Sequence, residues 1–124
     1  MRWIVDGMNV IGSRPDGWWR NRRRAMTALV ERLEQWAAAE GADVTVVFER
    51  PPSPPIESSL ITVTHAPEAG ANSADDEILR LVQADSRPDE ICVATSDRTL
   101  ADRVRGAGAA VYPAESLRNR IDPG

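Results

Sequence analysis

Three aspartates fall where a parallel α/β sheet would gather them. Asp6 closes the first apolar run of the sequence, Asp97 closes a later one, and Asp75 stands at the start of an intervening helix. Strand ends and helix starts of such a sheet lie along one edge, so we expect these side chains to meet there. Carboxylates brought together repel one another unless a cation lies between them. The pattern therefore predicts a divalent-metal site and favours phosphodiester chemistry.

Each of these acids also has an ordinary structural explanation. Asp6 followed by Gly7 is a common turn signal, and Asp97 before a helix is a common N-cap. Asp75 would interact favourably with the macrodipole of its helix. The joint placement of all three on one predicted edge is what favours a shared site. A glycine at position 7 would in that case let the backbone approach a phosphate closely.

Helical spacing separates the neighbours Asp75 and Asp76. Asp75 lies three and seven residues before Ile78 and Val82, so it shares the buried stripe of its helix. Ser73 and Asp76 fit a capping box, with Ser73 as the N-cap. We therefore assign Asp75 to the site and Asp76 mainly to capping; the alternative is that both are ligands.

Three further polar residues lie near the predicted site. Asn9 follows Asp6 by three residues and could orient it or hold a metal-bound water, or else cap the turn. Ser96 could support Asp97 in the same way. Glu49 ends the second strand on the same edge and is a weaker, fourth candidate acid.

A basic segment rich in tryptophan follows the first strand. Five of the 15 basic residues fall between Arg14 and Arg24, and the segment also contains Trp18 and Trp19. Arginines bind phosphates, and exposed aromatic rings stack on unpaired bases. We expect one tryptophan to be buried and the other available. The expected RNA contacts are Arg14, Trp18, Arg20, Arg23 and, beside Asp97, Arg98.

The composition excludes several classes of protein. The net charge is -4, and every basic residue is arginine, so neither a phosphate-binding P-loop lysine nor a Schiff-base lysine is present. A single histidine, His65, leaves one candidate for a Ser-His-Asp triad, and a single cysteine, Cys92, allows no intrachain disulfide. No apolar run is long enough to span a membrane, and the N-terminus lacks a secretory pattern. These features predict a cytoplasmic protein with no membrane partner.

The apolar pattern predicts an α/β fold with a mostly parallel central sheet and helices on both faces. We expect the first strand to be central, with the fourth strand beside it, and one domain over residues 1–124. Loops are expected after Gly7 and over 66–72. The expected strands are 2–6, 44–48, 60–63, 90–95 and 110–112, and the expected helices are 19–40, 74–84, 98–106 and 114–120.

Three short segments share the acids described above. They are Val5-Asp6-Gly7-Met8-Asn9-Val10-Ile11-Gly12, Ala74-Asp75-Asp76-Glu77-Ile78 and Thr95-Ser96-Asp97-Arg98. In this order and spacing they resemble the YacP-like branch of the NYN domains, which belong to the PIN-like ribonuclease group. The resemblance extends from Ile4 to about Tyr112.

The resemblance implies a three-layer PIN-like sandwich, Mg²⁺ or Mn²⁺ as cofactor, and cleavage of RNA. It also implies an association with ribosomes or other RNA machinery, as in some relatives. By motif position, the site residues that carry over are Asp6, Asn9, Asp75 and Asp97. The sequence departs from the family pattern at Met8, where an aromatic residue is usual, and at Glu49, where many relatives have aspartate.

The sequence therefore predicts a metal-dependent endoribonuclease. Asp6, Asp75 and Asp97 would hold one or two Mg²⁺ or Mn²⁺ ions, directly or through water, and the products would carry 5′-phosphate and 3′-hydroxyl ends. The alternative is a non-catalytic RNA-binding module of the same fold. A third hypothesis, a haloacid-dehalogenase-like phosphatase, would require a second acid where Met8 stands.

Overall fold

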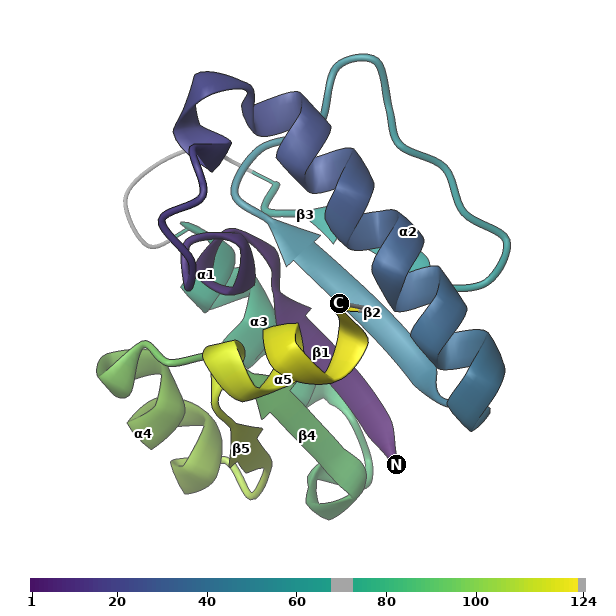
Figure 1. The fold of residues 1–124 in the computed structure, drawn as a ribbon. Coiled ribbons are helices and arrows are strands. Elements are labelled where there is room, and N and C mark those ends of the chain that lie inside the picture. Colours follow the sequence, from purple (N-terminus) through teal and green to yellow (C-terminus); the bar gives the residue numbers. More distant parts are fainter. Residues whose placement is uncertain (68–72, 123–124) are drawn as a thin grey trace.

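Five parallel strands form the central sheet, in the order β3-β2-β1-β4-β5 (Figure 1). The computed structural model describes residues 1–67 and 73–122. The first strand is central and has the fourth beside it, which confirms the predicted topology. The strands are β1 (Arg2–Asp6), β2 (Asp43–Phe48), β3 (Thr62–His65), β4 (Ile91–Ala94) and β5 (Ala110–Tyr112).

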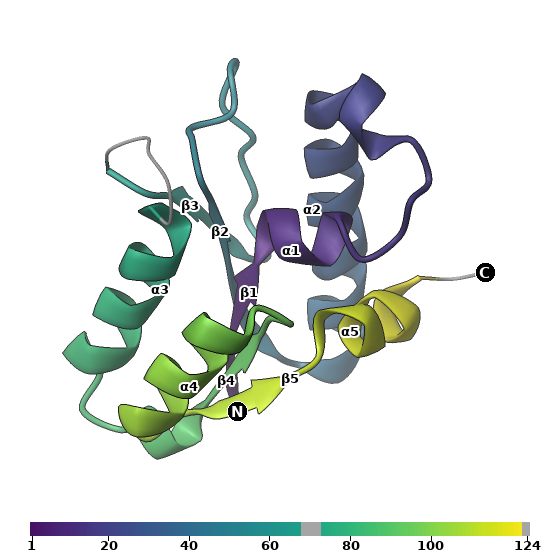
Figure 2. The same cartoon turned by 90° about the vertical axis from the view of Figure 1, so that its left-hand side faces the viewer.

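Helices cover both faces of this sheet and make three layers (Figure 2). The helices α1, α2 and α5 pack on one face, and α3 and α4 pack on the other. Their bounds are α1 (Gly7–Ile11), α2 (Arg22–Glu40), α3 (Ser73–Ala84), α4 (Arg98–Gly106) and α5 (Ala114–Ile121), with 3₁₀ turns η1 (Trp18–Arg20) and η2 (Pro88–Glu90). None of the helices in the described ranges has the length and apolarity needed to cross a membrane.

Alternate residues of each strand supply the two halves of the core. Val5 of β1 is fully buried against the α2 side, whereas its neighbour Ile4 packs with α3 and α4. This follows from the strand geometry, in which successive side chains point to opposite faces. The helix expected over 19–40 is α2, which buries an apolar stripe with Leu33 at its centre.

Some predicted boundaries are wrong. The segment after Gly7 forms the short helix α1 instead of a loop. The long helix begins at Arg22, because the side chain of Asn21 accepts a hydrogen bond from the backbone N–H of Arg24 and so caps it. The third strand begins at Thr62 rather than at residue 60. Residues 68–72 of the predicted loop lie outside the described residues.

Candidate active site

Four carboxylates line one cavity at the carboxyl edge of the sheet. The arrowheads of β1, β2 and β4 point to this edge (Figure 1). The cavity has a volume of about 370 Å³. Its acids come from four places in the chain: the end of β1, the residue after β2, the first turn of α3 and the residue before α4. The lining residues are Asp6, Met8, Asn9, Trp18, Arg22, Glu49, Ala74, Asp75 and Asp97.

Asp6 is the most perturbed of these acids. Only 6% of its surface is exposed. Burial raises the pKa of Asp6 from 3.8 to about 7, and the charges of Asp75 and Asp97 add to the rise, whereas a hydrogen bond from Thr95 opposes it. A nearby cation would favour the ionised form, because it would offset both the burial and the repulsion.

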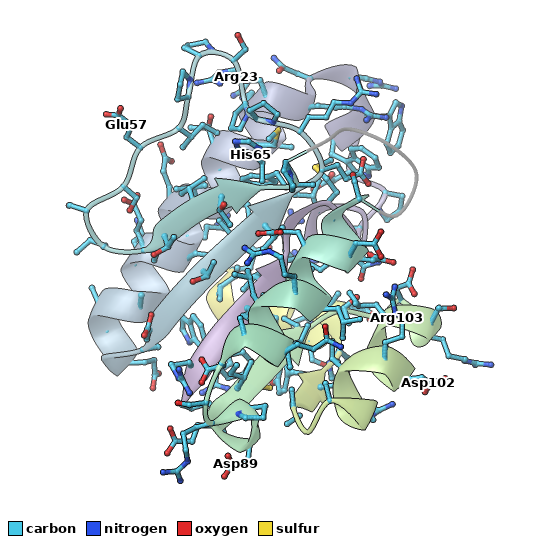
Figure 3. All side chains as sticks on the ribbon, turned by 180° about the vertical axis from the view of Figure 1, so that it is seen from behind. Arg23, Glu57, His65, Asp89, Asp102 and Arg103 are labelled. Atoms are coloured by element: carbon cyan, nitrogen blue, oxygen red, sulfur yellow. The ribbon has the colours of Figure 1, made fainter. Side chains whose placement is uncertain are left out.

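Asp75 faces the same cavity, and Asp76 does not. Burial raises the pKa of Asp75, and the negative charge of Asp97 raises it further. Asp76 is 67% exposed at its side chain and pairs with Arg103 of α4 at 3.2 Å. Arg103 extends from α4 on the face seen in Figure 3. The helical spacing of the sequence therefore separates the two neighbours correctly.

The capping box expected at the start of α3 does not form among the described residues. Ser73 is already the first residue of the helix and not its N-cap. Its buried hydroxyl has no hydrogen-bond partner in the described part of the chain. Asp76 is instead held by Arg103.

Asp97 reaches the cavity from a different position than expected. In the sequence Asp97 closes the apolar run that contains the expected strand 90–95, but β4 ends at Ala94. Asp97 is the N-cap of α4, where its Oδ1 accepts a hydrogen bond from the backbone N–H of Leu100 at 2.9 Å. The capping carboxylate also lines the cavity, so the capping explanation of this residue does not exclude the site explanation.

Thr95 and Asn9 connect the acid-bearing segments. The hydroxyl of Thr95 donates to Asp6 Oδ2 at 2.9 Å and accepts from the backbone N–H of Asp97 at 3.1 Å. Asn9 Oδ1 accepts from the backbone N–H of Ser96 at 2.8 Å. Asn9 therefore anchors the β4–α4 segment, and no hydrogen bond joins it to Asp6 in the described structure.

Ser96 does not support Asp97 in the way expected. Its hydroxyl accepts a hydrogen bond from the backbone N–H of Ala114 at 2.9 Å, at the start of α5. Thr95 bonds the carboxylate of Asp6 and the backbone of Asp97 instead, and the sequence interpretation missed this residue. The sequence feature that could have identified Thr95 is its hydroxyl group at the end of a buried apolar run, directly before Ser96 and Asp97.

The structure gives Gly7 a packing reason, and the expected approach of its backbone to a phosphate stays a prediction. A Cβ added at this buried residue would come within 2.6 Å of the Phe48 ring and 3.1 Å of the Val47 carbonyl oxygen. The glycine therefore lets α1 turn directly off the end of β1 against β2. That turn places Asn9 beside the cavity.

Some of the expected RNA-binding residues are bonded to other groups of the protein, and others are exposed. Arg14 is paired with Asp122 and Asn119, and Arg23 donates to the Pro54 carbonyl, beside the loop after β2 (Figure 3). Arg20 and Arg98 are exposed. Trp18 is half-buried and lines the cavity, whereas Trp19 is 51% exposed, as expected for one packed ring and one available ring.

Arg22 is a second residue that the sequence interpretation missed. It lines the acidic cavity, and its guanidinium lies 5.4 Å from the centroid of the Trp18 ring. It places a positive charge at the rim of an otherwise acidic site. The sequence placed Arg22 in the arginine-rich segment, but spacing alone could not distinguish it from the neighbouring arginines.

His65 and Cys92 lie outside this cavity. His65 ends β3 and is exposed, and its ring Nδ1 lies 2.8 Å from the carbonyl oxygen of Ala66. Cys92 is buried within β4, and burial raises the pKa of its thiol. Neither residue has the surroundings of a nucleophile in this site.

The acids fit a hydrated divalent cation better than a closed ligand cage. Within residues 1–67 and 73–122, no three Cys, His, Asp or Glu side chains form a group that could hold a metal ion by themselves. Mg²⁺ usually keeps several waters and takes one or two carboxylates directly. Carboxylate oxygens that repel one another around one cavity match that donor chemistry.

The five-stranded parallel sheet between two helix layers, together with the matches given next, places the chain among nuclease-like α/β domains. More specifically, the model of the YacP-like NYN domain matches residues 3–123, so the chain belongs to that family. No curated protein sequence matches the chain.

Two solved structures are similar over almost the whole chain. The crystal structure of Rae1 (YacP) from Bacillus subtilis has 26% sequence identity and a TM-score of 0.81, covering 98% of this chain and 73% of that one. The W164L mutant of the same protein gives 26% identity, a TM-score of 0.78, and coverage of 98% and 74%. These similarities agree with the three-layer fold described above.

Proposed function

We propose that this domain is a metal-dependent endoribonuclease that hydrolyses RNA phosphodiester bonds in the acidic cavity. The observation that carries the proposal is the burial of Asp6, with a pKa of about 7, in a cavity shared with Asp75 and Asp97. A buried carboxylate among like charges destabilises a fold, so such an arrangement favours a functional role. Membership of a nuclease-like family supports RNA as the substrate class.

Asp6, Asp75 and Asp97 would hold Mg²⁺ or Mn²⁺, directly or through water. When bound, such an ion lowers the pKa of water and stabilises negative charge on phosphate oxygens. Thr95 keeps the Asp6 carboxylate oriented, and Asn9 holds the segment that carries Asp97. In the overall reaction, water oxygen joins phosphorus, the P–O3′ bond breaks, and the 3′ oxygen takes a proton. The products are a 5′-phosphate and a 3′-hydroxyl.

The arginine-rich segment would hold the RNA. Arg20 and Arg98 are exposed and have no ion pair among the described residues, so they are the better candidates for phosphate contacts. Arg14 and Arg23 would first have to leave their present partners. A cytoplasmic location, expected from the composition, and an association with ribosomes, which the family resemblance implies, are part of this proposal.

The test is to incubate the purified protein with a mixed pool of single-stranded RNA, with Mn²⁺, with Mg²⁺ and with EDTA, and to map the new ends. We expect cleavage only with the metal, new 5′-phosphate and 3′-hydroxyl ends, and loss of cleavage in an Asp6→Asn variant that still binds RNA. Ends carrying a 2′,3′-cyclic phosphate, or cleavage in EDTA, would contradict the proposed chemistry.

A second candidate is a non-catalytic RNA-binding module. Arg20 and Arg98 are exposed and have no ion pair among the described residues, which favours RNA binding whether or not a metal ion is held. Such a module would use the same arginine segment and bind RNA equally well with and without Mn²⁺. It would yield no new ends in the experiment above.

A further inference from the structure

Two further cavities share lining residues with the acidic cavity. Trp18 lines both the acidic cavity and a pocket of about 430 Å³. Met8, Arg22 and Glu49 line both the acidic cavity and a pocket of about 210 Å³. The acidic cavity is therefore adjacent to both pockets, and the three cavities together are here called the track.

The larger flanking cavity, here called the arginine pocket, has an excess of positive charge. Its four arginines come from η1, α2 and α5. Arg32 and Arg118 form ion pairs with Asp122, and Arg118 also pairs with Asp16. Arg20 and Arg24 are exposed and have no ion pair in the part of the chain that the structure describes. Two guanidinium groups are thus available to bind a phosphate.

The smaller flanking cavity, here called the methionine pocket, has three apolar side chains in its lining. Met8, Met26 and Phe48 line it, with Glu49 and two arginines also around it. Methionine side chains are polarizable and adapt to flat, irregular ligands. A nucleobase has two apolar faces and a polar edge, so it matches an apolar pocket with charged groups around it.

We propose that a single strand of RNA lies along this track. An unpaired base would enter the methionine pocket, a backbone phosphate would bind Arg20 and Arg24 in the arginine pocket, and the bond to be cleaved would lie between them at the acidic cavity. The last part rests on the proposed function. The strand must be unpaired, because a base in a duplex stays stacked and cannot enter a side pocket.

Binding measurements in EDTA test the track independently of cleavage. The probe is a fluorescein-labelled 12-nucleotide single-stranded RNA, followed by anisotropy at several salt concentrations. The variants are Arg24→Ala, Arg20→Ala and Met26→Ala. The control is Arg105→Ala, which removes an equal charge from α4 at a residue outside all three cavities.

The two kinds of contact predict different signatures. Arg24→Ala and Arg20→Ala should each weaken binding several-fold and reduce the slope of log K against log salt by about 0.7, the value for one phosphate contact in a single strand. Met26→Ala should weaken binding about fivefold with an unchanged slope, because a base contact releases no counterions. The control should bind like the parent protein, and the matching RNA duplex should not respond to Met26→Ala.

The outcomes separate this inference from the proposed function. If the parent protein cleaves RNA but all three variants bind like Arg105→Ala, the track is wrong and the nuclease proposal stands. If the variants show the expected signatures but no metal produces cleavage, the track stands and the nuclease proposal fails. A Met26→Ala protein that does not fold would leave the two arginine variants, both at exposed positions, to decide the arginine pocket, and Met26→Gln to decide the methionine pocket.

Discussion

The hydroxyl of Thr95 donates a hydrogen bond to Oδ2 of Asp6 across 2.9 Å, although the two residues are 89 positions apart in the chain. The same hydroxyl oxygen accepts the backbone N–H of Asp97 at 3.1 Å. One side chain thereby connects the end of β1 to the start of α4. Two acids of the cavity are positioned relative to each other by this contact.

Replacing Thr95 by valine keeps the shape of the side chain and removes both hydrogen bonds. A hydrogen bond to the charged form lowers the pKa of Asp6, so its loss should raise that pKa further. If cleavage requires ionised Asp6, the acidic limb of the pH–rate profile should move to higher pH by about one to two units, since such bonds contribute about 1.5–3 kcal/mol. Thr95→Ser should retain the parental limb. Equal limbs for the two variants would show that the hydroxyl does not control Asp6.

Asp6→Asn should stabilise the protein without metal while it abolishes cleavage. The pKa of Asp6 is about 7 in the folded state against an ordinary 3.8, so the folded state holds the proton more tightly. The stability that Asp6 contributes by holding this proton is fully present below about pH 4 and is lost as the pH rises through 7. At about pH 8 the free energy of unfolding of the variant should exceed that of the parent protein by about 1–3 kcal/mol.

Urea unfolding of both proteins at several pH values checks this prediction. All measurements are made in EDTA. The difference in the free energy of unfolding between parent and variant should grow between about pH 4 and 8. Because the other groups that titrate in this range are the same in both proteins, their contributions cancel in this difference. A variant less stable than the parent at pH 8 would mean that the Asp6 charge is already compensated in the absence of a cation.

Gly7→Ala should destabilise the fold by about 1–3 kcal/mol. The new methyl group would lie 2.6 Å from the ring of Phe48, which is itself fully buried and has little room to move. Denaturant unfolding measures the effect, and Gly106→Ala, where an added Cβ meets nothing within 4 Å, is the matched control. Equal losses at the two positions would remove the packing explanation for Gly7.

Mn²⁺ should raise the melting temperature of the parent protein. A ligand at 100 times its Kd stabilises by about 2.7 kcal/mol, which corresponds to roughly 5 °C or more for a domain of this size. The rise should be larger at about pH 8 than at pH 6, because protons compete for Asp6 at the lower pH. Thermal unfolding measures the effect. EDTA should reverse the rise in melting temperature, and the Asp6→Asn variant should not show it. An equal rise in Asp6→Asn would place the ion elsewhere.

Most of the fold could be predicted because its signals are local and repeated. Apolar runs and the helical spacing of apolar residues around Leu33 are each legible within a few residues, and a glycine, Gly41, ends α2 in the left-handed conformation. The boundaries that were wrong depend on tertiary contacts. The helix α1 forms because Gly7 can pack against Phe48, and nothing near Gly7 in the sequence shows that contact.

The candidate site shows the same division. The gathering of Asp6, Asp75 and Asp97 follows from topology, which the sequence pattern contains. Thr95 could not be distinguished from other strand-end hydroxyls, because its role depends on a residue 89 positions away. The arginines were also hard to rank as RNA contacts. Arg14 differs from Arg20 because it bonds Asn119 of α5 and Asp122 just after that helix, which the sequence near Arg14 does not show.

The neighbours Asp75 and Asp76 allow the most direct test of the claim that distant carboxylates act together in one cavity. Asp75 lines the cavity, whereas Asp76 is exposed and pairs with Arg103. Single-turnover RNA cleavage with Mn²⁺ should fall by at least about 100-fold in Asp75→Asn, because even groups that only support a metal ligand contribute ~10–100-fold. Asp76→Asn should cleave within a few-fold of the parent protein. Equal rates for the two variants, whether both high or both low, would contradict the proposed site.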